Sequence, residues 1–377
     1  MKRRIERGIL EHDVPVRDQM KHCIARPTLS GEIAVIDLFC GAGGLTHGLV
    51  QAGLHVVAGL DVEPSCRFPY EHNNPCLFLE QDVEQVPVDT LSTLFEAYPM
   101  RVLAGCAPCQ PFSSYSQGIK GRQTDDWRLL YAFARLVSVL RPEVVTMENV
   151  PRVMNYAVYH DFRGTLESLG YFVTSCRVFC PDYGVPQTRT RLVLLASLLR
   201  PIALRSPTHS PPNYTTVRDA IGILEPIKAG EISSHDRLHK ACKLSPLNMQ
   251  RIQASKPGGT WRDWQDSLVA TCHQQDNGVT YPSVYGRMKW DKPSPTITTQ
   301  CYGFGNGRFG HPEQDRAITL REAALLQTFP AAYQFVSPDQ PLFFSAVGRL
   351  IGNAVPVMLG RVIGQSIVDH FTTEACL

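Results

Sequence analysis

The sequence contains no long apolar run. None of its segments reaches the roughly 18 uninterrupted apolar residues that a membrane-spanning helix requires. The first 32 residues are charged throughout, and they have no apolar stretch of the kind found in a secretory signal. These absences argue against a secreted or membrane protein and predict a cytoplasmic location.

Charged residues make up only 19% of the chain, and their signs nearly balance to a net charge of +2. So small a net charge neither requires nor excludes a polyanionic partner, because nucleic-acid binding depends on local basic clusters. Internal repeats are also absent. The 44% hydrophobic content is typical of a globular protein, and 377 residues suffice for one large domain or two ordinary ones.

Seven short apolar runs alternate with helical stretches in the first half of the chain. They occupy residues 33–39, 55–61, 76–82, 101–106, 143–149, 171–179 and 191–197. Most of them are nearly continuous, as expected of strands that are buried on both faces. The pattern predicts an α/β fold with a doubly wound sheet, in which ligands bind beyond the carboxyl ends of the strands.

The sequence changes character near residue 200. RPIALRSPTHSPPNYTT, residues 200–216, is rich in Pro, Ser and Thr and is typical of a linker. From there to residue 318 the alternation of strands and helices is lost, and we expect a second, smaller and irregular β-rich domain. A helix then opens with a capping box of Thr319 and Glu322, and Pro356 interrupts the last helical stretch.

A glycine-rich turn, DLFCGAGGLTHGL, follows the first run from Asp37 onward. Glycines allow close approach to a ligand, and the next helix directs its N-terminus at the same place. Asp61 and Asp82 close the next two runs, where they could accept hydrogen bonds from ribose hydroxyls and an adenine amine. An NAD-dependent dehydrogenase is the weaker alternative, because Thr46 stands where the third glycine of G-x-G-x-x-G belongs.

The stretch GCAPCQPFSSYS, residues 105–116, allows three interpretations of its two cysteines. A zinc site would need a second pair of ligands, and Cys176 and Cys180 have unsuitable spacing. A redox dithiol fits C-x-P-C better, but such motifs open a helix, and here a polar loop follows. The third interpretation is a single nucleophile, Cys109, with Cys106 as a packing residue.

A cysteine nucleophile needs a partner that handles protons. Glu148 and Asn149 end the fifth apolar run, on the same sheet edge at which we expect Cys109. A carboxylate in that position could also be a helix cap or a solvent-facing acid.

Taken together, six motifs resemble those of bacterial restriction-modification DNA (cytosine-5)-methyltransferases. In chain order they are DLFCGAGGLTHGL, GCAPCQPFS, ENV, QTRTR, RMKWDKPSPTITT and GNAVP. The resemblance implies a Rossmann-like S-adenosylmethionine-dependent catalytic sheet and a target-recognition domain. It also implies methylation of carbon 5 of a flipped-out cytosine in DNA, through a covalent cysteine adduct at carbon 6. The same chemistry on transfer RNA is the alternative.

The resemblance assigns roles to individual residues. It implies that Cys109 is the nucleophile and that Glu148 is the acid that binds the target base, with Arg189 and Arg191 supporting the catalytic site. No metal is expected. The residues implied for the S-adenosylmethionine pocket are Asp37, Phe39, Gly41, Gly43, Leu45, Asp61, Asp82 and Asn353.

We expect three regions in the chain. Residues 1–32 form an N-terminal extension expected to be disordered, residues 33–199 plus 340–377 form the catalytic domain, and residues 200–339 form the target-recognition domain. Double-stranded DNA is the expected partner, and a cognate restriction endonuclease encoded nearby is a candidate second partner. We expect a monomer that makes no contact with membranes.

Overall fold

The computed structural model describes residues 32–108, 127–275, 278 and 283–372. Almost all of the expected N-terminal extension therefore lies outside the described residues. The described strands and α-helices are, in chain order, β1 (Ile33–Leu38), α2 (Gly44–Gln51), β2 (His55–Asp61), α3 (Arg67–Asn73), β3 (Leu77–Glu80), α4 (Val88–Phe95), β4 (Met100–Gly105), α5 (Arg128–Leu140), β5 (Val144–Asn149), α6 (Ala157–Ser168), β6 (Phe172–Phe179), β7 (Thr190–Ser197), α7 (Val217–Ile221), α8 (Pro246–Ala254), α9 (Leu320–Leu326), α10 (Phe344–Asn353) and α11 (Val357–Thr372).

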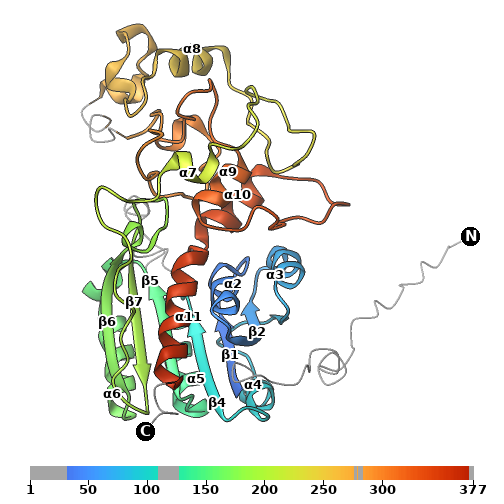
Figure 1. Cartoon of the computed structure of the whole chain (residues 1–377), viewed down its shortest axis with the longest axis vertical. Helices are drawn as coiled ribbons and strands as arrows, with labels where there is room; N and C mark the ends of the chain where they lie inside the picture. Colours follow the sequence, from blue (N-terminus) through green and yellow to red (C-terminus); the bar gives the residue numbers. More distant parts are fainter. Residues whose placement is uncertain (1–31, 109–126, 276–277, 279–282, 373–377) are drawn as a thin grey trace, which may run out of the picture.

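The seven expected strands form one sheet in the order β3-β2-β1-β4-β5-β7-β6 (Figure 1). Strands β1 to β5 are parallel, and β7 runs antiparallel to both of its neighbours. Every residue of β1 and β5 is buried, which explains the continuous apolar runs that predicted them. The order of the strands reverses between β1 and β4, so the ligand site of such a sheet is expected at their carboxyl ends.

Helices cover both faces of the sheet. Val35 of β1 belongs to the core completed by α2, α3 and α11, whereas its neighbour Ile36 belongs to the core completed by α4, α5 and α6. On the first face α11 packs tightly on α2, because a Cβ atom on Gly48 would lie 2.3 Å from the carbonyl oxygen of Val357. The α/β doubly wound prediction is therefore confirmed.

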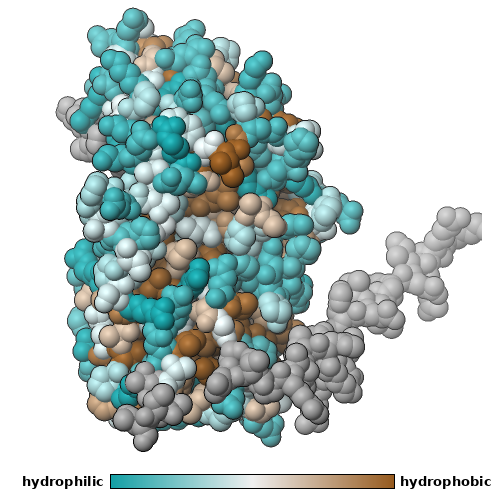
Figure 2. Space-filling model, viewed as in Figure 1, coloured by the Kyte–Doolittle hydropathy of each residue, from teal (hydrophilic) through white to brown (hydrophobic). Residues whose placement is uncertain are grey.

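The expectation of a β-rich second region was wrong for the described part of residues 200–339. These residues form α7, α8, α9, short turns and isolated bridges such as Arg287 with Gly310, but no strand. Prolines and glycines recur through this segment, and they interrupt ladders because proline lacks an N–H donor and glycine disfavours extended structure. Figure 2 shows that the viewed face of this upper part is predominantly hydrophilic.

The irregular part shares its main core with the sheet. Ile202, Val217 and Ile318 are buried in the same cluster as Val35 of β1. A smaller cluster lies nearer the tip, and it contains Ile252, Trp261, Trp264, Phe304 and Ala317. Where the irregular part adjoins the sheet and its helices, the two therefore share one continuous hydrophobic core.

The two helical features expected near the C-terminus are confirmed. Thr319 accepts a hydrogen bond from the N–H of Glu322, and Glu322 accepts one from the N–H of Thr319. Helix α10 ends before Pro356, and α11 begins after it. Among the described residues, Phe344–Thr372 is long and apolar enough to cross a membrane, but 72% of its most apolar window is buried. The pair α10–α11 is thus a core element.

Candidate active site

Glu148 lies buried at the carboxyl end of β5, with only 2% of its surface exposed. Its Oε1 atom is 2.9 Å from Nε of Arg191 on the neighbouring strand β7. The two strands are antiparallel neighbours, so the end of β5 lies beside the start of β7 and the carboxylate meets the guanidinium at that edge of the sheet. A buried carboxylate needs such a partner, because an unpaired charge inside a protein is strongly destabilising.

Cys106 is the second partner of Glu148. Its Sγ atom donates a hydrogen bond to Oε2 of Glu148 at 2.9 Å. The backbone around it is fixed, since Cys106 N–H donates to the carbonyl of Leu38 and Asn149 Nδ2 donates to the carbonyl of Ala107. The sequence interpretation treated Cys106 as a packing residue and missed this contact.

Cys109 lies outside the described residues, three positions after Cys106 in the chain. The structure describes the preceding segment up to Pro108, at the carboxyl end of β4, next to β5 and Glu148. The role of Cys109 as nucleophile stays a prediction.

Arg189 has an environment different from that of Arg191. Its Nη1 donates to the carbonyl of Ile297 at 3.1 Å, and its Nη2 lies 3.5 Å from the carbonyls of Gly352 and Ala354. Burial lowers the pKa of the Arg189 guanidinium to about 10. Arg189 therefore joins three motifs that are far apart in the sequence, QTRTR, PSPTITT and GNAVP.

The glycine-rich turn after β1 has positive φ angles at Phe39, Gly41 and Gly43, of 59°, 53° and 85°. A Cβ atom on Gly43 would also lie 2.8 Å from Nδ2 of Asn74, so this position requires glycine for two reasons. The N–H of Gly41 donates to Oδ2 of Asp61 at 2.9 Å. The turn is thereby fixed beside the carboxyl end of β2.

Asp37 is 1% exposed, and its Oδ2 accepts a hydrogen bond from the hydroxyl of Thr46 at 2.7 Å. Thr46 thus has a structural use at the place where a dinucleotide motif would carry glycine. The Oδ1 atom of Asp37 is a buried acceptor with no hydrogen-bond partner among the described residues. Burial raises the pKa of Asp37 to about 7. An unpaired acceptor beside the turn fits a ligand that carries hydrogen-bond donors.

The other predicted pocket residues lie around this turn or behind it. Asp61 also accepts from the N–H of Glu63, and burial raises the pKa of the Asp61 carboxyl. Leu45 is buried in the core beneath the turn, whereas Asn353 is exposed at the end of α10. Asp82 follows β3, where its Oδ1 accepts from the N–H of Glu84 at 2.9 Å.

The GNAVP segment lies against the glycine-rich turn. A Cβ atom on Gly44 would lie 2.4 Å from the carbonyl oxygen of Val355. The motif that contains Asn353 is therefore adjacent to the motif that contains Gly41 and Gly43, although about 300 residues separate them in the chain.

Comparison with known proteins identifies the class to which this site belongs. Residues 33–369 match the family of C-5 cytosine-specific DNA methylases. The chain is 53% identical over 337 residues to the type II methylase M.HgiDII of Herpetosiphon aurantiacus, a match that covers 89% of this chain and 94% of that protein. It is 32% identical over 351 residues to the type II methyltransferase M1.HphI of Haemophilus parahaemolyticus, which covers 91% of this chain and 88% of that protein.

Solved structures agree on the fold. A protein encoded within an Escherichia coli prophage superposes with a TM-score of 0.69 at 22% identity, covering 90% of this chain and 99% of that one. DNMT2 of Spodoptera frugiperda superposes with a TM-score of 0.62 at 16% identity, covering 89% of this chain and 99% of that one.

The chain belongs to the C-5 cytosine-specific DNA methylase family. Its activity is the site-specific methylation of DNA at carbon 5 of cytosine.

Proposed function

We propose that Cys109 and Glu148, supported by Arg191, carry out methyl transfer to a cytosine flipped out of double-stranded DNA. The observation that carries this proposal is the buried Glu148 carboxylate, which is paired with Arg191 beside the segment that leads to Cys109. Carbon 6 of cytosine is inaccessible within a stacked duplex, so the base must leave the helix at a cost of a few kcal/mol.

The chemistry needs a nucleophile because carbon 5 of cytosine is itself a weak one. The Cys109 thiolate adds to carbon 6, a carbon–sulfur bond forms, and the electron pair of the carbon 5–carbon 6 double bond moves into the ring. Glu148 in its protonated form donates to ring nitrogen 3 and accepts from the exocyclic amine, which stabilises the charge that develops. A free thiol has a pKa of about 8.5, so positive charge such as that of Arg191 favours the thiolate.

The adduct is then resolved. Carbon 5 takes the methyl group and loses its proton to a base, the carbon–sulfur bond breaks, and Cys109 leaves as the thiolate. The aromatic ring is restored with one methyl group added.

The methyl donor of this family is S-adenosylmethionine, which supplies an electrophilic methyl group when bound. We assign its binding to the glycine-rich turn, with Asp37, Gly41 and Gly43, and to the acids Asp61 and Asp82. The unpaired Oδ1 of Asp37 supports this assignment. Phe39, Leu45 and Asn353 complete the assigned set.

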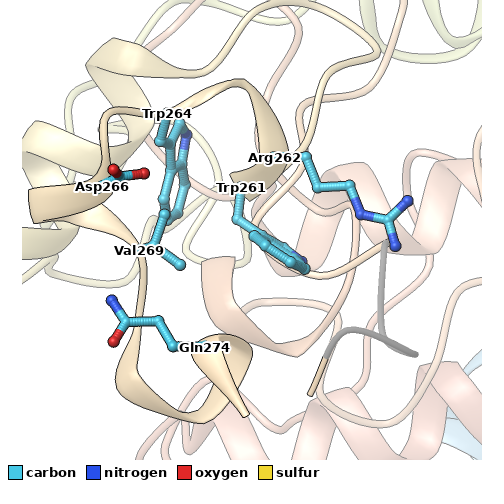
Figure 3. Close-up of a pocket in the computed structure, with 6 residues that line it drawn as sticks. All are labelled: Trp261, Arg262, Trp264, Asp266, Val269 and Gln274. Carbon is cyan, nitrogen blue, oxygen red and sulfur yellow. The ribbon is translucent and has the colours of Figure 1, made fainter. Parts of the chain in front are cut away.

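We assign target recognition to residues 200–339, and catalysis to residues 33–199 with 340–377. Near the tip of the irregular part is a pocket of about 460 Å³, lined by Trp261, Arg262, Trp264, Asp266, Val269 and Gln274 (Figure 3). The guanidinium of Arg262 lies 5.5 Å from the ring centre of Trp261. Arginine and glutamine are the side-chain types that read guanine and adenine edges in the major groove. This pocket supports a role in base recognition.

The type II relatives favour a place in a restriction–modification system. We propose a monomeric, cytoplasmic modification enzyme that protects DNA from a cognate endonuclease encoded nearby. The same relatives favour duplex DNA over transfer RNA as the substrate.

The proposal is tested by incubating the protein with S-adenosylmethionine carrying a labelled methyl group and with mixed-sequence duplex DNA or transfer RNA. We expect label in duplex DNA, on carbon 5 of cytosine in one short sequence that bisulfite sequencing identifies, and none with Cys109→Ala. Label confined to RNA, or a fully active Cys109→Ala variant, would contradict the proposal.

A further inference from the structure

We propose that Cys106 is a positioning residue for the methyl-transfer reaction. Its thiol, by donating to Oε2 of Glu148, fixes the orientation in which the carboxyl group meets the flipped cytosine. This inference rests on the role proposed above for Glu148.

The geometry holds the carboxylate from two sides. Arg191 Nε forms an ion pair with Oε1 at 2.9 Å, although Oε1 accepts no hydrogen bond from the described residues, and Cys106 Sγ donates a hydrogen bond to Oε2 at 2.9 Å. The two oxygens therefore have different partners, one from β7 and one from the residue that follows β4. Rotation of the carboxyl group about its terminal bond would break at least one of these contacts. A carboxyl group has about four lone-pair positions on its two oxygens, so positions that Arg191 and Cys106 leave open can carry the proton donated to ring nitrogen 3 and accept from the exocyclic amine.

The thiol itself is well placed to act in this way. The register of β4 and β5 pairs Gly105 with Met147, so the next residues along each strand, Cys106 and Glu148, are lateral neighbours. A thiol is a weak donor to a neutral group, but donation to a charged acceptor is roughly twice as strong. The contact therefore has the strength and the position to orient Glu148.

A packing role for Cys106 predicts a different response to substitution. Cys106 is half-buried and contacts the main apolar core. If it only filled space, alanine would be tolerated at least as well as serine, because serine buries a hydroxyl there. If it positions Glu148, serine keeps the donor and alanine removes it. Which of the two variants retains more activity therefore distinguishes the packing role from the positioning role.

The experiment measures kcat and the KM for duplex DNA, together with the melting temperature, for Cys106→Ala and Cys106→Ser. A hydrogen bond to a charged group accounts for roughly 10- to 100-fold in rate, so we expect a loss of that size in kcat for Cys106→Ala. The KM for DNA and the melting temperature stay near the wild-type values, and Cys106→Ser stays within a few-fold of wild-type kcat. Cys176→Ala, which removes a half-buried thiol from β6, is the matched control and keeps full activity.

A double variant tests whether Cys106 acts through Glu148. Adding Cys106→Ala to Glu148→Gln should cost no further activity, since the group that it positions is already changed. Equal losses in the alanine and serine variants, a serine variant worse than alanine, or additive losses in the double variant would each overturn the inference. A wild-type protein that fails to methylate DNA would instead refute the proposed function, so the two failures are distinguishable.

Discussion

The site depends on single side chains whose positions are fixed by strand ends. Glu148 is the clearest case, since its two oxygens have separate partners and almost none of its surface is exposed. A carboxyl group held in this way has its orientation set before the base arrives, so it can donate to the ring without reorganisation.

Changing Glu148 to glutamine should leave DNA binding intact and lower kcat by about 10²-fold or more, because the amide cannot give a proton to the base. Single-turnover methyl transfer and a DNA-binding titration measure the two quantities separately. Glu143→Gln is the matched control, since Glu143 pairs with Arg101 at 2.8 Å at the other end of β5. Turnover of Glu148→Gln close to wild type would exclude the assigned role.

Asp37 gives a prediction about pH. Its carboxyl group has a folded-state pKa of about 7 against an ordinary value of 3.8, because burial disfavours the charged form. The folded state therefore holds the Asp37 proton more tightly than the unfolded state does. This contribution to the free energy of unfolding is fully present below pH 3.8 and is lost as the pH rises through 7. Between pH 4 and 8 the melting temperature of the wild type should therefore fall relative to that of Asp37→Asn. A constant difference between the two would contradict the burial of an ionisable group there.

The sequence pattern predicted that Glu148 ends a strand at the ligand-binding edge of the sheet, and the family resemblance added Arg191, but neither predicted the Cys106 contact. Spacing along a chain does not state which residues are lateral neighbours in a sheet until the strand register is known. Cys106 and Glu148 are 42 residues apart and meet only because β4 pairs with β5 in one register. The signal that was present in the sequence was that each of these residues ends an apolar run.

At the scale of elements, runs of apolar residues predicted the strands, but no sequence pattern predicted the structure of the irregular part. Strands such as β1 and β5 are buried on both faces, so their apolar runs were unambiguous. Residues 200–339 carry polar, proline and glycine residues in no fixed period, and their contacts are made by side chains such as Arg287, which reaches four backbone carbonyls. Local pattern does not encode contacts of that kind.

The N-terminus of α9 provides a stability prediction. Glu322 accepts two hydrogen bonds of 2.7 Å from the fully buried Arg316 and one from the N–H of Thr319. Glu322→Gln keeps the shape but leaves the Arg316 charge unpaired, which should cost about 3–5 kcal/mol in the free energy of unfolding.

Denaturant titration measures this cost, and a matched control is available on α6. Glu167→Gln breaks the exposed Arg163–Glu167 pair, and it should change the unfolding free energy by about 0–1 kcal/mol. If the two variants lowered the free energy of unfolding equally, burial of the Arg316–Glu322 pair would not determine how much that pair stabilises the protein.

At the scale of the whole molecule, the continuous core joins the two regions. Ile202, Val217 and Ile318 of the irregular part are buried in the same cluster as Val35 of β1. Arg189, which directly precedes β7, donates to the carbonyl of Ile297 and contacts the GNAVP segment. Regions joined in this way do not unfold independently. We expect calorimetry to show one cooperative transition for the protein without ligands. Two well-separated transitions would show that residues 200–339 fold as an autonomous unit.

The central claim of the mechanism is a transient bond between one sulfur atom and carbon 6 of an extruded cytosine. Duplex DNA that carries 5-fluorocytosine at the target position tests it directly, because fluorine at carbon 5 prevents the final elimination and leaves the adduct in place. With S-adenosylmethionine present we predict a covalent complex whose peptide mass spectrum places the bond at Cys109. Absence of a complex under conditions that methylate ordinary DNA, or a bond at any other side chain, Cys106 included, would contradict the account.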